Sequence, residues 1–320
     1  MDIVARARLL ADEVLFPAAL ETDAAAAVPR RILDALADAG LYGSALDVDF
    51  ATICSVQEAL ASGCLTTAFL WVQHIGLFHR ITASEDERLR DRWLEPLASG
   101  EVRAGLALGG ALPQPTLHAR ADGDSWVLDG FSPFVSGWGR IDAVHTAARV
   151  GGEIVWLIVD ARESPALHVE RLRLAVLDAS ATVRARFDGL AVPGDRLTGR
   201  HPAGGRTPPE VLRLHAALGL GVASRCCRLL GPTPLDDELA ACRAELDRLD
   251  PATIFRSRAA AGELALRAAA ALGVVQGSRA LLATDHAQRL AREALFTLLY
   301  ALRPESKDAA LAQLGARRGE

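Results

Sequence analysis

The chain has 320 residues, half of them hydrophobic, and a formal net charge of −5. Its positive charge is almost wholly arginine, with Lys307 as the only lysine, and no block of like charge occurs, which excludes a polybasic surface for nucleic acid or membrane. We expect no apolar run long enough to cross a bilayer, and therefore a soluble protein of two or three domains.

Five cysteines lie within apolar helical patterns, namely Cys54, Cys64, Cys226, Cys227 and Cys242. Their odd number, and the lack of a CxxC or Cys/His spacing, predict buried thiols and no metal site. Segment 1–21 mixes arginines and acids with its apolar residues, which a secretory signal does not tolerate. Together these features predict a cytoplasmic location, and the richness in arginine and alanine is typical of a GC-rich bacterial genome.

Residues 1–97 have helical periodicity. Ile3, Ala7, Leu10 and Val14 share one face of a first helix, and a second runs from Pro29 to Gly40. Further helices are predicted at 50–62, 65–78 and 85–97, with Gly63 and Gly100 as interruptions. The pattern predicts an N-terminal helical domain over 1–97.

Residues 98–202 alternate between apolar and polar positions instead. Asp129-Gly130 supplies a positive φ and predicts a hairpin turn after the strand 126–128. The other predicted strands are 104–108, 143–149, 154–159, 167–170 and 183–187. This spacing predicts a middle antiparallel β-domain, as a small barrel or sandwich.

A Gly/Pro-rich linker at 203–209 precedes a return of helical periodicity. Helices are predicted at 212–230, 235–249, 252–275 and 287–302, which would form a four-helix bundle in a C-terminal domain over 203–320. The predicted fold class is therefore α+β, with helices before and after an antiparallel β-domain.

The order of elements and several motifs resemble the acyl-CoA dehydrogenase superfamily. The matching segments are 97–101 leading into 105–108, then 121–130, 134–136, 159–160, 183–193 and 289–294. The resemblance covers nearly the whole chain, although the C-terminal third is shorter than usual. It implies a flavin held between the middle and C-terminal domains.

The resemblance implies FAD as the cofactor, with FMN or a reduced flavin as alternatives. In relatives a Trp-Ile-Thr-like tripeptide packs on the flavin ring and places a hydroxyl near its N5 edge, and the matching residues here are Phe134, Val135 and Ser136. The alternative is that Ser136-Gly137 forms only a turn and Phe134 only core. The further cofactor-binding candidates are Leu108, Gly137, Gly277 and Arg292.

Two cofactor motifs of the family are altered. Where relatives have a Gly-Ser-Asp loop, this chain has 109–115, GGALPQP, which keeps glycines for close backbone approach but lacks the side-chain donors. The Arg-x-Gln-Phe-Gly segment that reaches the pyrophosphate in relatives is abbreviated to 229–235 and has no arginine. Arg225 and Arg228 lie just upstream as substitutes, or as ordinary solvated charges.

The family's catalytic base is also missing. Counting the family interval from Arg292-Glu293-Ala294 reaches Ala301, which cannot accept a proton. Glu210 lies close to an alternative base position, although an acid in the first turn of a helix is also favoured by the helix dipole. His74 is the second catalytic candidate, and its alternative is a hydrogen-bonded core histidine.

The leading prediction is a flavin-dependent oxidoreductase acting on a small-molecule or acyl-thioester substrate. Because Ala301 replaces the base, a flavin monooxygenase of the same fold, which needs no α-proton base, is an alternative. A non-catalytic scaffold or partner subunit is the second alternative. The resemblance implies a homodimer or homotetramer, or a hetero-oligomer whose partner supplies the missing groups.

Overall fold

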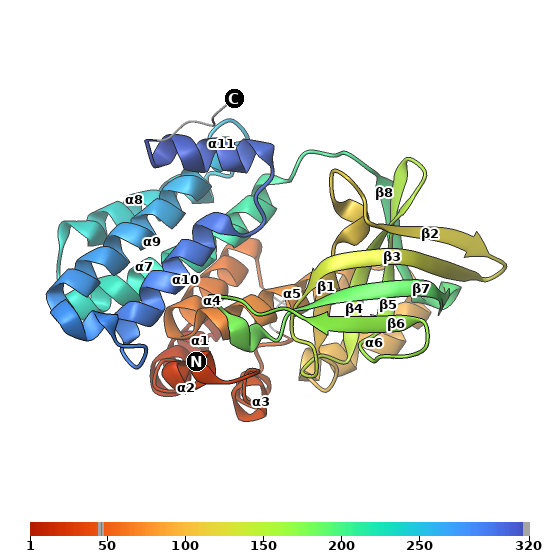
Figure 1. The fold of residues 1–320 in the computed structure, drawn as a ribbon, viewed down its shortest axis with the longest axis horizontal. Coiled ribbons are helices and arrows are strands. Elements are labelled where there is room, and N and C mark those ends of the chain that lie inside the picture. The colour runs from red at the N-terminus through yellow and green to blue at the C-terminus, as the bar shows by residue number, and fades with distance from the viewer. Residues whose placement is uncertain (44–45, 47, 316–320) are drawn as a thin grey trace.

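Helices, strands and helices follow one another in the computed structural model, which describes residues 1–43, 46 and 48–315. The strands gather at one end of the molecule and the C-terminal helices at the other, with the N-terminal helices α1 to α5 below and between them (Figure 1). The predicted arrangement of helical domain, β-domain and helical bundle is confirmed. The elements change type between Ser99 and Ala104 and between Pro202 and Pro209, close to the boundaries at 97/98 and 202/203, which remain predictions.

The N-terminal helices begin and end where the local sequence predicts. The Asp49 carboxylate accepts from the Thr52 N–H at 2.8 Å where α4 begins, and Gly100 ends α6 with φ +76°. The first predicted helix is interrupted by a π-helical turn. The elements are α1 (Ile3–Leu10), η1 (Ala11–Leu15), α2 (Ala19–Ala24), α3 (Arg30–Asp38), α4 (Phe50–Gly63), α5 (Leu65–Thr82) and α6 (Glu87–Ser99).

The middle domain is one eight-stranded sheet in the order β6-β7-β3-β2-β4-β5-β8, with β1 paired to β4. β4 runs parallel to β1 and to β2, so the sheet is mixed, whereas the sequence predicted an antiparallel one. The strands are β1 (Ala104–Ala107), β2 (Leu117–Asp122), β3 (Ser125–Val135), β4 (Ala143–Val150), β5 (Glu153–Asp160), β6 (Leu167–Arg171), β7 (Val183–Pro193) and β8 (Leu197–Pro202). Of these, β2 and β8 were not predicted.

The hairpin turn predicted at Asp129-Gly130 is wrong. Both residues lie inside β3, and the turn between β2 and β3 is at Gly123, which has φ +57°. Asp129 instead faces a bulge in β7, where its Oδ1 accepts from the Gly189 N–H at 2.8 Å. The same Asp-Gly chemistry that favours a turn therefore serves a bulge here.

The four predicted C-terminal helices are present and a fifth, α11, follows them. They are α7 (Pro209–Leu230), α8 (Pro234–Asp247), α9 (Ile254–Gln276) with the 3₁₀ turn η5 (Gly277–Leu281), α10 (His286–Leu299) and α11 (Pro304–Gln313). Residues 316–320 of the predicted C-terminal domain lie outside the described residues. Pro304 begins α11 because proline is well accommodated in a first helical turn.

One helical stretch corrects the expectation that no segment is long enough to cross a membrane. By length and composition alone, Ile254–Leu281 meets that criterion. Within the molecule 44% of its most apolar window is buried, and α9 packs against α7, α8, α10 and α11. Its apolar character therefore has an explanation in the bundle core.

Gly221 lets α7 cross α4 at close range. A Cβ at Gly221 would lie 2.4 Å from the Glu58 carbonyl oxygen and 2.6 Å from Ala61 Cβ. We therefore expect Gly221→Ala to lower the free energy of unfolding by about 1–3 kcal/mol in urea titrations, because α4 and α7 must separate. Gly76→Ala is the matched control: this helical glycine has nothing within 4 Å of the added Cβ, so the change should stabilise by about 0.5–1 kcal/mol. Equal effects of the two substitutions would contradict the crossing argument.

Candidate functional site

The turn after β3 exposes an aromatic side chain beside a buried hydroxyl. Phe134 is 62% exposed, whereas Val135 and Ser136 are buried. Gly137 has φ +90°, and a Cβ there would lie 2.8 Å from Ile141 Cγ2, so the turn requires glycine. The ring of Phe134 is therefore uncovered and accessible to a ligand.

Ser136 ends a chain of three buried hydroxyls. Its Oγ lies 2.7 Å from Thr182 Oγ1, which in turn lies 2.7 Å from Ser180 Oγ. Each hydroxyl has one proton to donate. If Ser180 donates to Thr182 and Thr182 donates to Ser136, the proton of Ser136 remains free for an external acceptor.

A strained loop holds the turn in place. Leu177 and Ala181 have φ of +58° and +50°, on either side of the short 3₁₀ helix η3 (Asp178–Ser180). The N–H groups of Gly137 and Trp138 donate to the carbonyls of Ser180 and Ala181 at 2.6 and 3.2 Å. Left-handed non-glycine residues persist only where the surroundings over-determine them, and they concentrate at ligand sites.

The loop after Leu108 packs closely against strands β3 and β4. Leu108 is 39% exposed. Gly109 and Gly110 pack closely against other backbone segments of this chain and not against an open ligand site. A Cβ on Gly110 would lie 2.4 Å from Ala148 Cα in β4, and one on Gly109 would lie 2.5 Å from the Phe131 carbonyl oxygen. These glycines therefore already have a structural reason that needs no ligand.

The arginines considered for the cofactor are ion-paired in the structure. Arg292 donates to Asp23 of α2, and Arg225 and Arg228 both donate to Asp12, at 2.5 and 2.9 Å. Gly277, with φ +60°, ends α9 on the exposed side of the bundle. The three arginines are therefore paired with carboxylates of this chain, and Gly277 ends a helix. Their role in binding a cofactor stays a prediction.

The position expected for the base lies beside a buried polar cluster. Ala301 is exposed with φ +52°, and the preceding Tyr300 packs with ring centroids 4.9 Å from His215 of α7. Arg258 of α9 lies 5.5 Å over the Tyr300 ring and donates to its carbonyl at 2.6 Å. Tyr300 Oη, His215 Nδ1 and Arg258 Nε are buried without a partner among the described residues. Sequence reasoning missed His215 and Arg258, because only folding brings them to Tyr300.

Carboxylates are absent from this cluster within the described chain. Glu210 is exposed in the first turn of α7, as an acid favoured by the helix dipole would be. Glu293 is buried and paired with Arg289 at 2.6 Å. Burial raises the pKa of the Glu293 carboxyl, and Arg289 opposes this effect. The role of Glu210 as a base remains a prediction.

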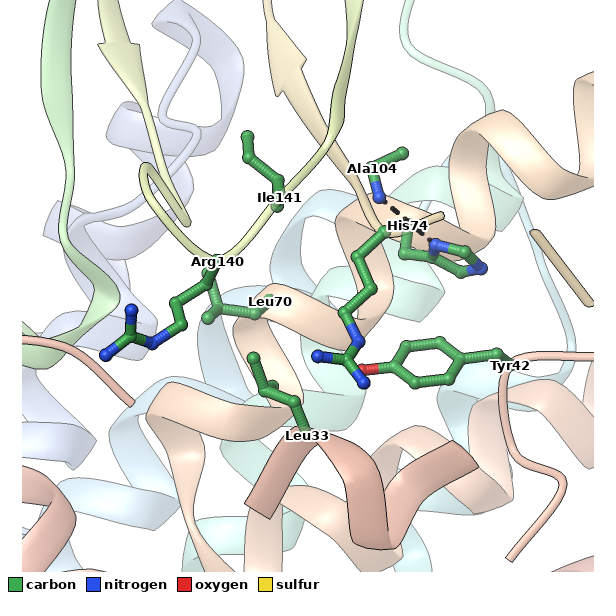
Figure 2. Close-up of a pocket in the computed structure, with 8 residues that line it drawn as sticks. Leu33, Tyr42, Leu70, His74, Ala104, Arg140 and Ile141 are labelled. Atoms are coloured by element: carbon green, nitrogen blue, oxygen red, sulfur yellow. Dashed lines mark hydrogen bonds between the residues drawn. The ribbon is translucent and has the colours of Figure 1, made fainter. Parts of the chain in front are cut away.

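His74 joins α5 to the sheet. Its Nδ1 accepts from the Ala104 N–H at 3.2 Å, as Figure 2 shows. Burial lowers the pKa of His74 to about 3, so the ring is neutral. It lines a cavity of about 10 Å³ with Tyr42, Leu33 and Ile141, which has room for about one water. This is the placement of a hydrogen-bonded core histidine, one of the two interpretations drawn from the sequence.

Metal chemistry has no support in the described part of the chain. No group of three or more His, Cys, Asp or Glu side chains is placed to hold a metal ion there. The five cysteines are free, and all are buried except Cys242, which is partly buried.

Comparison with known proteins gives a consistent family. Residues 1–101 match the family model for the N-terminal domain of acyl-CoA dehydrogenases. A probable acyl-CoA dehydrogenase, fadE25, from Mycobacterium leprae is 27% identical over 228 residues, covering 64% of this chain. The mitochondrial short-chain specific acyl-CoA dehydrogenase of Bos taurus is 25% identical over 245 residues, covering 69%. These matches span 57% and 59% of the two relatives.

Solved structures share the fold over almost the whole chain. The acyl-CoA dehydrogenase from Geobacillus kaustophilus superposes with a TM-score of 0.81, covering 97% of this chain and 96% of its own at 19% identity. A glutaryl-coenzyme A dehydrogenase in complex with glutaryl-CoA gives 0.80 at 18% identity, covering 98% and 95%. The FAD complex of PigA also gives 0.80, at 17% identity, covering 98% and 97%. The N-terminal domain, the curated relatives and the fold together support membership of the acyl-CoA dehydrogenase superfamily.

Proposed function

We propose that this chain is a flavin-dependent oxidoreductase whose flavin lies against the turn formed by Phe134, Ser136 and Gly137, between the middle and C-terminal domains. The observation that carries the proposal is the exposed Phe134 beside a hydroxyl chain that ends at Ser136. Structural neighbours with the same fold are described with FAD or FADH2 bound, which supports FAD, with FMN or a reduced flavin as alternatives.

The residues of the turn fit the ring of a flavin better than its phosphates. Phe134 offers an aromatic face and Ser136 a hydrogen-bond donor, while the loop 109–115 has no hydroxyl or charged side chain. A bound flavin would supply hydride acceptance or oxygen activation, and this chain would supply packing, orientation and a hydrogen bond at Ser136. We propose that the missing phosphate contacts come from backbone groups or from a partner subunit, in a homodimer, homotetramer or hetero-oligomer.

The substrate chemistry follows from Ala301. Removing an α-proton from an acyl thioester needs a base, whereas the polar cluster beside Ala301 consists of Tyr300, Arg258 and a neutral His215. This composition favours a flavin monooxygenase of the same fold over ordinary acyl-CoA oxidation. A non-catalytic scaffold remains the alternative favoured by the altered phosphate motifs. We further propose a cytoplasmic location, which the five free cysteines support.

Flavin binding tests the proposal. The purified protein should show flavin absorbance or bind FAD, FMN or reduced flavin in calorimetric titrations. Ser136→Ala should weaken binding roughly tenfold through loss of one hydrogen bond. Thr182→Val should weaken it several-fold, because Ser136 loses the hydroxyl that orients it. Thr146→Val is the matched control, since Thr146 is a buried β4 residue whose hydroxyl donates to the Val144 carbonyl and to no other group in the described part of the chain.

Three outcomes separate the alternatives. If Ser136→Ala and Thr182→Val weaken flavin binding as expected, two further assays follow. Anaerobic reduction of the flavin by acyl-CoA substrates would indicate a dehydrogenase. Oxygen consumption with reduced flavin would indicate a monooxygenase. Equal affinity in the wild type, Ser136→Ala and Thr182→Val would place the flavin elsewhere. The folded protein could also bind no flavin, either alone or with proteins encoded by neighbouring genes. That result would contradict the proposed enzyme activity and favour the non-catalytic scaffold.

A further inference from the structure

A second hollow lies in the helical half of the molecule, away from the Phe134 turn. It has a volume of about 410 Å³ and is enclosed by α1 with η1, α4, α7 and α8. Figure 1 shows α7 and α8 at the end of the molecule opposite β3, with α1 and α4 beside them. Its walls are polar and charged, with Arg8, Asp12, Glu58, Ser224, Arg228 and Arg243 among them. The volume is in the range of small-molecule sites.

Positive charge exceeds negative charge at this hollow. The Asp12 carboxylate serves two guanidiniums, accepting from Arg225 at 2.5 Å and from Arg228 at 2.9 Å. Arg243 donates from Nε to Glu58 at 3.1 Å and neutralises it. Arg8 makes no ion pair or side-chain hydrogen bond with any described residue. Three guanidiniums and two carboxylates therefore line the hollow, and the buried Arg225 shares Asp12 from behind, in a protein whose overall charge is negative.

Several donors at the hollow are still free. The Ser224 hydroxyl makes no hydrogen bond with the described residues, and Arg8 has its whole guanidinium available. Arg228 is held by Asp12 and also donates to Ser62 Oγ at 2.9 Å. The close crossing of α4 and α7 at Gly221 keeps these walls at a fixed separation. The donors are thus pre-positioned before any ligand arrives.

We propose that this hollow binds an anionic phosphate group, as inorganic pyrophosphate or as the phosphate end of a nucleotide. Guanidinium forks and hydroxyls match phosphate oxygens in geometry and charge. The net positive charge of the lining and the unpaired guanidinium of Arg8 favour an anion, and the volume leaves space beyond the phosphate for a larger group. This proposal does not depend on flavin binding.

Calorimetric titration of the full chain with inorganic pyrophosphate, ADP and adenosine tests the proposal. Pyrophosphate and ADP should bind and adenosine should not. Arg8→Ala should weaken binding roughly tenfold by removing charge-assisted hydrogen bonds, and Ser224→Glu should abolish it by placing a carboxylate against the ligand. Tighter binding of ADP than of pyrophosphate would identify a nucleotide site, and the reverse a site for the free anion.

Arg256→Ala is the matched control, because Arg256 is an exposed arginine on α9 without an ion pair among the described residues. It should leave the affinity unchanged. Equal weakening by Arg8→Ala and Arg256→Ala would show general charge attraction and overturn the proposal. Failure of pyrophosphate and ADP to bind the folded protein at low ionic strength would also overturn it. Thermal melting of each variant confirms folding, and neither Arg8→Ala nor Ser224→Glu breaks an existing pair.

Discussion

Lowering the pH from neutral to about 5 is expected to reduce the free energy of unfolding by roughly 6 kcal/mol through three histidines whose pKa is lowered in the folded chain. Burial lowers the pKa of His74, His145 and His215 to about 3 in the folded chain. In the unfolded chain each has its ordinary pKa of about 6.5. Between about pH 3 and pH 6.5 these histidines are therefore protonated in the unfolded chain and neutral in the folded chain. The stabilisation is therefore complete above about pH 6.5 and is lost as the pH falls toward 3.

Urea unfolding at a series of pH values measures this loss. His215→Leu should reduce the slope of unfolding free energy against pH by about 1.4 kcal/mol per pH unit. His215 is the cleanest choice, because no hydrogen bond of its ring is seen with the described residues. His118→Gln, at an exposed site on β2, is the control and should leave the slope unchanged. An identical slope in His215→Leu and the wild type would show that His215 is protonated when folded.

Replacing Glu293 by alanine is expected to lower the free energy of unfolding by about 3–5 kcal/mol. The Arg289 and Glu293 side chains are 1% and 3% exposed and lie 2.6 Å apart. Without Glu293, Arg289 becomes a buried charge whose remaining partner is His286 Nδ1 at 3.3 Å. A buried charge without a counter-charge is far more costly than either an intact pair or an apolar replacement of both residues.

The double variant Arg289→Met/Glu293→Leu separates the charge effect from packing. It should recover most of the stability lost in Glu293→Ala, since no charge is then buried. Glu87→Ala, which removes an exposed partner of Arg90, should change stability little. Circular dichroism during urea unfolding measures all three. A double variant no more stable than Glu293→Ala would mean that the cavity left by the side chain, and not the charge, causes the loss.

Elements marked by local chemistry could be predicted from the sequence. The Gly63 break between α4 and α5 and the Gly100 end of α6 were found because glycine and helix capping act within a few residues. Asp129-Gly130 was misread because the same dipeptide suits a turn and a bulge. Only the neighbouring strand, through the Gly189 N–H, decides between them.

The candidate flavin turn could be proposed only in part from the sequence, and its role stays a prediction. The sequence identified Phe134 and Ser136 through the family motif, but Ser136 is organised by Thr182, which lies 46 residues away. The partner of Arg292 is Asp23, separated from it by 269 residues. Contacts at such distances leave no periodicity or spacing in the sequence, so pattern reasoning had no means of predicting them.

The sequence by itself determined the order of helices and strands, the presence of alanine at position 301 and the resemblance to a family, because each depends on residue identity or local spacing. Only the tertiary structure decided which charges are neutralised and which polar groups remain free. It placed Arg225 and Arg228 on one carboxylate at Asp12, and His215 and Arg258 beside Tyr300. Burial, pairing and pKa depend on what surrounds a group in space, and chain folding alone sets those surroundings.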